Sequence, residues 1–319
     1  MIGYSLGCAA PALLIMFLGP RIKQATEPEK VYSASDFTKL RYGRIMNVVS
    51  GGVALFNMFI FLTSELTSIG NIFSQMTSFW ITSYRVSVTV SMGAFTIFYT
   101  ALAGYPASMI SDRIQAVSII LFIIMLLIAT CVLPANKVTW KQFDKASNWT
   151  TGGLETAIII NIGLVSSALF DQSNWQRVYA ADSDNSLRRG YFGGAILVFL
   201  VMMYFGILGM LGYAKDPAAY DSYYKYAYMS FFDTLEPLKN GWHIVVLLLA
   251  CSLSASTIDT LQNAITSVFS HDFMRLRVTW DPLFIARFIV IAINVPAIYI
   301  ATNDKLNILQ LFAIGTLST

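Results

Sequence analysis

Charged side chains are scarce in this sequence, and their scarcity indicates the class of protein. Only 12% of the 319 residues are Asp, Glu, Lys or Arg, whereas 56% are hydrophobic. Soluble domains carry about 25% charged residues. A water-soluble enzyme is excluded because so few ionised groups could not cover its surface, and a disordered chain is excluded by the high apolar content. The composition therefore predicts a helical protein that crosses a lipid bilayer several times.

Few residues suit metal or nucleophilic chemistry. The three cysteines, Cys8, Cys131 and Cys251, lie in apolar runs without the spacing of a metal site or a disulfide framework. The two histidines, His243 and His271, lie far apart, and no nucleophile–base pair is evident. The net charge of +3 is too small and too scattered for binding to nucleic acid. We expect neither an enzyme nor a nucleic-acid partner.

Long apolar runs account for most of the chain. A helix needs about 20 apolar residues to cross a hydrocarbon core of about 30 Å, and the alternating pattern of an outer-membrane barrel does not occur. Eight suitable stretches, and a ninth that stops at the end of the sequence, lie at 3–19, 45–74, 86–105, 114–134, 154–175, 191–213, 242–269, 284–302 and 306–319. We predict one all-α transmembrane domain over 1–319, and we expect it to be a fragment of a longer transporter.

Lys and Arg are unevenly distributed over the two sides of these predicted spans. The connections after the first, third, fifth and seventh spans, with Arg287, hold 13 of the 21 basic residues and ten of the eleven arginines. By the positive-inside rule this side faces the cytoplasm, and the amino terminus begins outside. The acceptor motif Asn148-Trp149-Thr150 falls on the predicted outer side, which makes Asn148 a candidate glycosylation site.

Four acidic residues lie in or next to the predicted spans, where a charge is costly unless it is paired or solvated. Glu65, Asp112 and Asp171 each have a plain interpretation as a cap or a solvated end of a helix. Asp259 does not, because it lies deep in the hydroxyl-rich segment 252–260. We therefore treat Asp259 as a functional candidate.

The hydroxyl-rich segment suggests a cation site. Hydroxyls can bond back to their own helix, but their density here exceeds that need. Small hard cations such as Na⁺ prefer oxygen ligands, which Ser256, Thr257 and a freed carbonyl of Leu253 would supply on adjacent positions of one helix.

Several short motifs occur in one order along the chain, and with them the sequence resembles the sodium:solute symporter family. One of them departs mildly from the family pattern at two places, with Ala103-Gly104 in place of Gly-Gly and Ser111 in place of Thr. The matching segments are Asp36-Phe37 with Arg41-Tyr42-Gly43, Ser111 to Gln115, Asp171 to Arg177, Ser256 to Thr260, and Phe269 to Asp272.

The resemblance implies a leucine-transporter-like core of two inverted repeats with a central site at broken helices, here incomplete. The 154–175 span would be a broken helix that unwinds around 161–163 and 166–167, and the 242–269 span would carry sodium. The resemblance implies Leu253, Ser256 and Thr257 as sodium ligands, with Asp112 on the inner exit path. Asp259 or Asp112 would carry a proton instead if coupling is to H⁺.

The implied function is symport of a small polar solute with Na⁺ or H⁺ by alternating access, in the plasma membrane and without another cofactor. The segment 170–177 and the start of the next span look most like urea and polyamine transporters. We expect urea or a related nitrogen compound, bound by Asn161, Ser166, Ser167 and Gln172. Two alternatives stay open: a transporter-like sensor or receptor that binds solute without moving it, and a symporter for an amino acid or a sugar.

Overall fold

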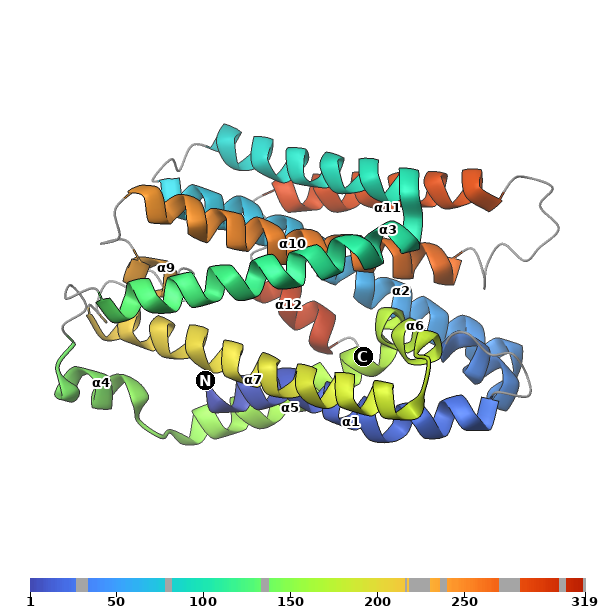
Figure 1. The fold of residues 1–319 in the computed structure, drawn as a ribbon, viewed down its shortest axis with the longest axis horizontal. Coiled ribbons are helices and arrows are strands. Elements are labelled where there is room, and N and C mark those ends of the chain that lie inside the picture. The colour runs from blue at the N-terminus through green and yellow to red at the C-terminus, as the bar shows by residue number, and fades with distance from the viewer. Residues whose placement is uncertain are drawn as a thin grey trace.

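Helices form all of the regular structure in the part of the chain that the computed structural model describes. The described residues are 1–26, 34–77, 82–132, 138–215, 217, 230–235, 240–269, 282–303 and 308–317. The helices (Figure 1) are α1 (Ile2–Thr26), α2 (Ala34–Thr77), α3 (Thr82–Val132), α4 (Trp140–Ser147), α5 (Thr151–Phe170), α6 (Gln172–Ala180), α7 (Asp184–Lys215), α9 (Ser230–Leu235), α10 (Asn240–Val268), α11 (Pro282–Thr302) and α12 (Ile308–Leu317).

Eight segments are long and apolar enough to cross a membrane, which confirms the predicted number of full spans. They are Ile2–Thr26, Asp36–Ser74, Tyr84–Leu102, Met109–Cys131, Thr151–Phe170, Asp184–Lys215, Gly241–Val268 and Phe284–Thr302. The ninth predicted stretch contains the ten-residue helix α12.

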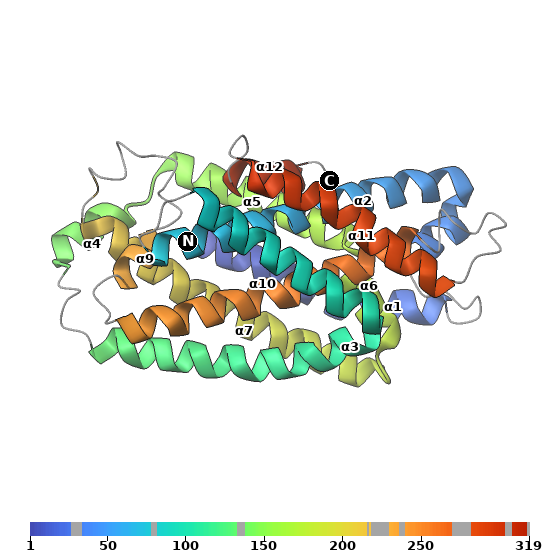
Figure 2. The ribbon, with the colours of Figure 1, turned by 90° about the horizontal axis from the view of Figure 1, so that it is seen from above.

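The long helices lie side by side in an elongated bundle, as two perpendicular views show (Figures 1 and 2). At one end of the bundle lie the carboxyl ends of α1 and α10, the amino ends of α2, α7 and α11, the bend of α3, and helix α6 (Figure 1). The Lys and Arg count assigned the connections between these elements to one side of the membrane. Their clustering at one end is what that topology requires.

Helix α3 differs from the prediction of two separate spans at 86–105 and 114–134. Its helical backbone continues from Thr82 to Val132 and bends sharply between two apolar segments (Figure 1). The second apolar segment starts at Met109, earlier than predicted. Ser111 and Asp112, whose polarity suggested a boundary, lie within the helix, and both hydrogen-bond to side chains of α10.

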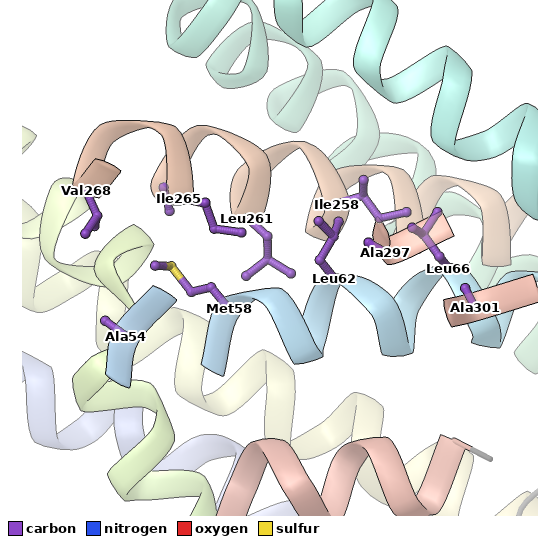
Figure 3. Close-up of a cluster of buried hydrophobic side chains, with 11 residues drawn as sticks. Ala54, Met58, Leu62, Leu66, Ile258, Leu261, Ile265, Val268, Ala297 and Ala301 are labelled. Carbon is purple, nitrogen blue, oxygen red and sulfur yellow. The ribbon is translucent and has the colours of Figure 1, made fainter. Parts of the chain in front are cut away.

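The core that positions the polar residues forms where α2 packs antiparallel to α10, with α11 beside them (Figure 3). Apolar residues at every fourth position of α2 meet a similar stripe of α10, as helical periodicity requires. The buried residues are Ala54, Met58, Leu62, Leu66, Ile258, Leu261, Ala264, Ile265, Val268, Ala297 and Ala301. This packing aligns the middle of α10 with the last third of α2.

The break in the predicted 154–175 span lies at Asp171, not at 161–163 or 166–167 as expected. Helix α5 continues without interruption to Phe170, and α6 starts at Gln172. The break is stable because side chains satisfy both helix ends. The Asp171 carboxylate accepts the Ser173 N–H at 2.9 Å, and Trp175 Nε1 donates to the carbonyl of Leu169 at 2.8 Å.

Candidate functional site

A polar cluster forms where α10, α3 and α6 meet. Ser256 Oγ on α10 donates to Asp112 Oδ1 on α3 at 2.7 Å. Arg177 Nη2 on α6 lies 3.5 Å from Asp112 Oδ2. The structure thus brings together two of the residues predicted to handle the cation, Ser256 and Asp112, and adds a cationic partner that the sequence analysis did not assign to the site.

Asp259 lies beside this cluster and is completely buried. Two hydroxyls of α3 donate to its Oδ2 atom, Tyr99 Oη at 3.0 Å and Ser111 Oγ at 3.2 Å. Arg177 Nη2 lies 3.4 Å from Thr260 Oγ1, the next residue of α10. Ser111 belongs to one of the motifs, but nothing in the sequence indicated that Ser111 or Tyr99 would contact Asp259.

Leu253 and Thr257 lie one turn apart on an exposed face of α10. The helix is continuous here, so the expected freeing of the Leu253 carbonyl does not occur. That carbonyl accepts a hydrogen bond from Thr257 Oγ1 at 3.1 Å. The five predicted ion ligands therefore divide into two sets: Leu253 and Thr257 on the exposed face, and Ser256, Asp259 and Asp112 at the contact with α3.

Of the four predicted solute contacts, only Gln172 is more deeply buried than Ser167. Its hydroxyl donates to Asn57 Oδ1 on α2 at 3.2 Å, and Asn57 Nδ2 donates to the carbonyl of Gly315 on α12 at 2.6 Å. Asn57 and Ser167 are 1% and 4% exposed. A side-chain amide, a hydroxyl and a backbone carbonyl from three helices therefore meet in the interior. Asn57 was not among the predicted residues.

The other three predicted solute contacts lie apart from this pair. Asn161 Nδ2 donates to the carbonyl of Gly3 at 2.7 Å and joins α5 to α1. The Oε1 atom of Gln172 accepts the backbone N–H of Ala34 at 3.2 Å, at the first residue of α2. Ser166 is half-buried. No single site collects all four residues.

Asp171, interpreted from sequence as a solvated helix end, is instead half-buried between α5 and α6. Burial raises the pKa of its carboxyl group, and the hydrogen bonds from Ser173 and the charge of Arg177 oppose that rise. Its contact with the Ser173 N–H makes it the cap of α6. Asp171 therefore shapes the break in the helix.

Glu65, interpreted from sequence as a cap near a helix end, lies inside α2, which continues to Thr77. Ser254 Oγ on α10 donates to Glu65 Oε2 at 3.2 Å. The contact joins the two helices of the core, so the cap interpretation is wrong.

Asn148 is exposed at the carboxyl end of α4. Its accessibility suits a glycosylation acceptor, which stays a prediction.

Comparisons with known proteins agree with one another. A family model for the sodium:solute symporter family matches residues 3–317. A spermidine transporter of Candida albicans is 24% identical over 322 residues, which cover 98% of this chain and 58% of the relative. The fold resembles a Na⁺-coupled sialic acid symporter solved in a substrate-bound outward-open state, with a TM-score of 0.69, 16% identity, and coverage of 94% of this chain and 66% of that one. The chain thus spans little more than half the length of the curated relative.

Proposed function

Because this chain belongs to the sodium:solute symporter family, we propose that it performs Na⁺-coupled symport of a small polar nitrogen compound by alternating access. The chain is an integral membrane protein with a leucine-transporter-like fold, and its relatives are transporters rather than enzymes. The observation that carries the proposal is the oxygen-rich contact of Ser256 with Asp112, next to the buried Asp259.

The cluster provides a way to couple a cation to a change of conformation. Asp112 accepts from Ser256 and pairs with Arg177, so α10, α3 and α6 are joined while the ion pair is intact. A Na⁺ ion that reaches Asp112 competes with Arg177 for the same carboxylate, and it biases the equilibrium by its differential affinity for the two states. The membrane potential adds about 2.3 kcal/mol per charge per 100 mV.

Leu253 and Thr257 complete the proposed ion path on the exposed face of α10. The carbonyl and hydroxyl oxygens are one turn apart and already share a hydrogen bond at 3.1 Å. Rotation of the Thr257 hydroxyl would let both oxygens face one ion. A proton on Asp259 or Asp112 is the alternative form of coupling, and uptake that is independent of Na⁺ but steep in pH would support it.

The solute is a nitrogen compound in this proposal, and urea and a polyamine are the two candidates. The buried Asn57–Ser167 pair offers an amide and a hydroxyl, the groups that a neutral solute such as urea needs. The related Candida albicans protein is described as a spermidine transporter, which supports a polyamine. Asn161, Ser166 and Gln172 stay weaker candidates because two of them hold neighbouring backbone.

The proposal is tested by uptake of labelled urea and labelled spermidine into proteoliposomes over a range of Na⁺ concentrations. The double change Ser256→Ala and Thr257→Ala should raise the Na⁺ concentration for half-maximal uptake about tenfold or more, since two oxygen ligands are lost. Ser252→Ala is the matched control on the same helix, because among the described residues its hydroxyl donates to the carbonyl of Leu248, within its own helix. Unchanged Na⁺ dependence of uptake in the double variant would contradict the proposed sodium site. Binding of solute without its accumulation would favour the alternative of a transporter-like sensor.

A further inference from the structure

Glu65 has one hydrogen-bond partner among the described residues, the Ser254 hydroxyl on α10. Ser254 lies 13 residues after Gly241 and 14 before Val268, the limits of the apolar span of α10. The contact is therefore near the middle of the bilayer. A carboxylate at that depth costs several kcal/mol unless it is paired or solvated.

Glu65 has fewer polar partners than the other acidic residues inside the bundle. Asp112 pairs with Arg177, Asp171 caps a helix, and Asp259 accepts three hydroxyls. No Lys, Arg or His within the described ranges forms an ion pair with Glu65, and its Oε1 atom accepts no hydrogen bond there. Within the described ranges, the Glu65 carboxyl group therefore has no cationic partner.

Aromatic rings from three helices pack together one turn of α2 before Glu65. Phe61 precedes Glu65 by one turn of α2 and so shares its face. The ring of Phe312 on α12 lies 6.2 Å, between centroids, from both Phe61 and Tyr4 of α1. Since ring faces carry partial negative charge, the rings do not neutralise Glu65 but add to its attraction for a cation.

The chemistry of this group suits an organic cation better than a metal ion. A hard cation takes about six oxygen ligands, whereas the described contact supplies only the Glu65 carboxyl group and the Ser254 hydroxyl. An alkylammonium group needs one carboxylate, one or two acceptors and aromatic faces, which attract it through cation–π contacts. The arrangement therefore matches a protonated amine with an aliphatic chain.

We propose that Glu65, Ser254 and the rings of Tyr4, Phe61 and Phe312 recognise an alkylammonium group of the transported solute. This inference rests on the proposed symport function and selects a cationic amine over neutral urea. Bound amine would compensate the charge of Glu65, and the rings would exclude water around the contact.

Binding of radiolabelled 1,4-diaminobutane to the purified protein in saturating NaCl tests the inference. The unchanged protein should bind the diamine, and excess 1,4-butanediol, a neutral analogue of similar length, should not displace it. Glu65→Gln should weaken binding about tenfold or more, because a charge-assisted hydrogen bond is lost. Phe61→Leu should weaken it roughly threefold by removing one ring. Glu155→Gln, on an exposed turn of α5, is the matched control and should bind like the unchanged protein.

Three results would overturn the inference: equal diamine affinity in Glu65→Gln, binding of labelled urea but not of diamine by the unchanged protein, or a Glu65→Gln variant that loses only its Na⁺ stimulation. A thermal unfolding curve for each variant, with and without Na⁺, separates loss of binding from loss of fold. The symport proposal fails separately, if the unchanged protein accumulates no solute in response to Na⁺ whatever Glu65 does.

Discussion

At the scale of single residues, polar side chains join α3, α10 and α11 in the apolar interior. Gln262 Nε2 on α10 donates to Asn294 Oδ1 on α11 at 2.8 Å and to Thr96 Oγ1 on α3 at 3.1 Å. All three residues are at most 2% exposed. Because lipid offers no replacement partner, each lost acceptor leaves a buried donor that is less well satisfied.

Asn294→Ala should destabilise the protein by about 1 kcal/mol, since hydrogen bonds between membrane helices contribute about 0.6 kcal/mol on average and an unsatisfied buried amide adds to that cost. Thermal unfolding in detergent measures the effect as a lower melting temperature. Asn185→Ala, an exposed position on α7, is the control. Equal melting temperatures for the two variants would show that the bond to Gln262 has no net value.

At the scale of elements, close packing of α7 against the short helix α9 depends on one glycine. A Cβ atom on Gly212 would lie 2.0 Å from the carbonyl oxygen of Ser230 and 2.6 Å from Thr234 Oγ1. A backbone carbonyl cannot move aside as the end of a flexible side chain can. Any side chain at position 212 must therefore push the two helices apart. Small residues at helix contacts serve this purpose in membrane proteins.

Gly212→Ala should therefore lower stability by about 1–3 kcal/mol, the usual cost of overpacking. Gly193→Ala on the same helix meets no atom within 4 Å, and it should leave stability unchanged or raise it slightly, because alanine favours helix more than glycine does. The two variants are compared by thermal unfolding under identical conditions. A Gly212→Ala protein as stable as Gly193→Ala would mean that α9 is not held against α7 in this way.

At the scale of the whole molecule, most of the described arginines belong to elements that share one end of the bundle, as the topology predicts. Arg177 on α6, Arg188 and Arg189 near the start of α7, and Arg287 near the start of α11 belong to elements that share one end (Figure 1). Arg85 belongs to the opposite end, where its Nη2 atom donates to the carbonyl of Thr302 at 3.0 Å. Arg85 therefore joins α3 to α11.

The topology predicts that Asn148 faces the non-cytoplasmic side and receives an N-linked glycan in a eukaryotic cell. Treatment with a glycan-removing amidase should lower the apparent mass, and Asn148→Gln should abolish that shift. Thr150→Ser is the matched control, because it keeps both the acceptor motif and the hydroxyl that caps α5. A glycan-free protein would remove this support for the orientation. If a thiol reagent labelled an Asn148→Cys variant only from the cytoplasmic side, the predicted orientation would be reversed.

Much of this architecture follows from local chain composition. The eight spans were predicted because about 20 consecutive apolar residues are a property of the segment alone, and the family was recognised because its motifs are short. The helix break at Asp171 was misplaced, although its signals are local: an Asp cap, and Asn174 and Trp175 reaching back to the last carbonyls of α5.

The pairing of polar residues came from packing. Ser254 lies 189 positions from Glu65 in the chain, and Tyr99 lies 160 from Asp259. Composition shows that such residues are costly in a membrane, but which of them meet depends on the rotation and register of helices brought together by the α2–α10 core. A carboxylate without a compensating cation could therefore be recognised only once its neighbours were in place.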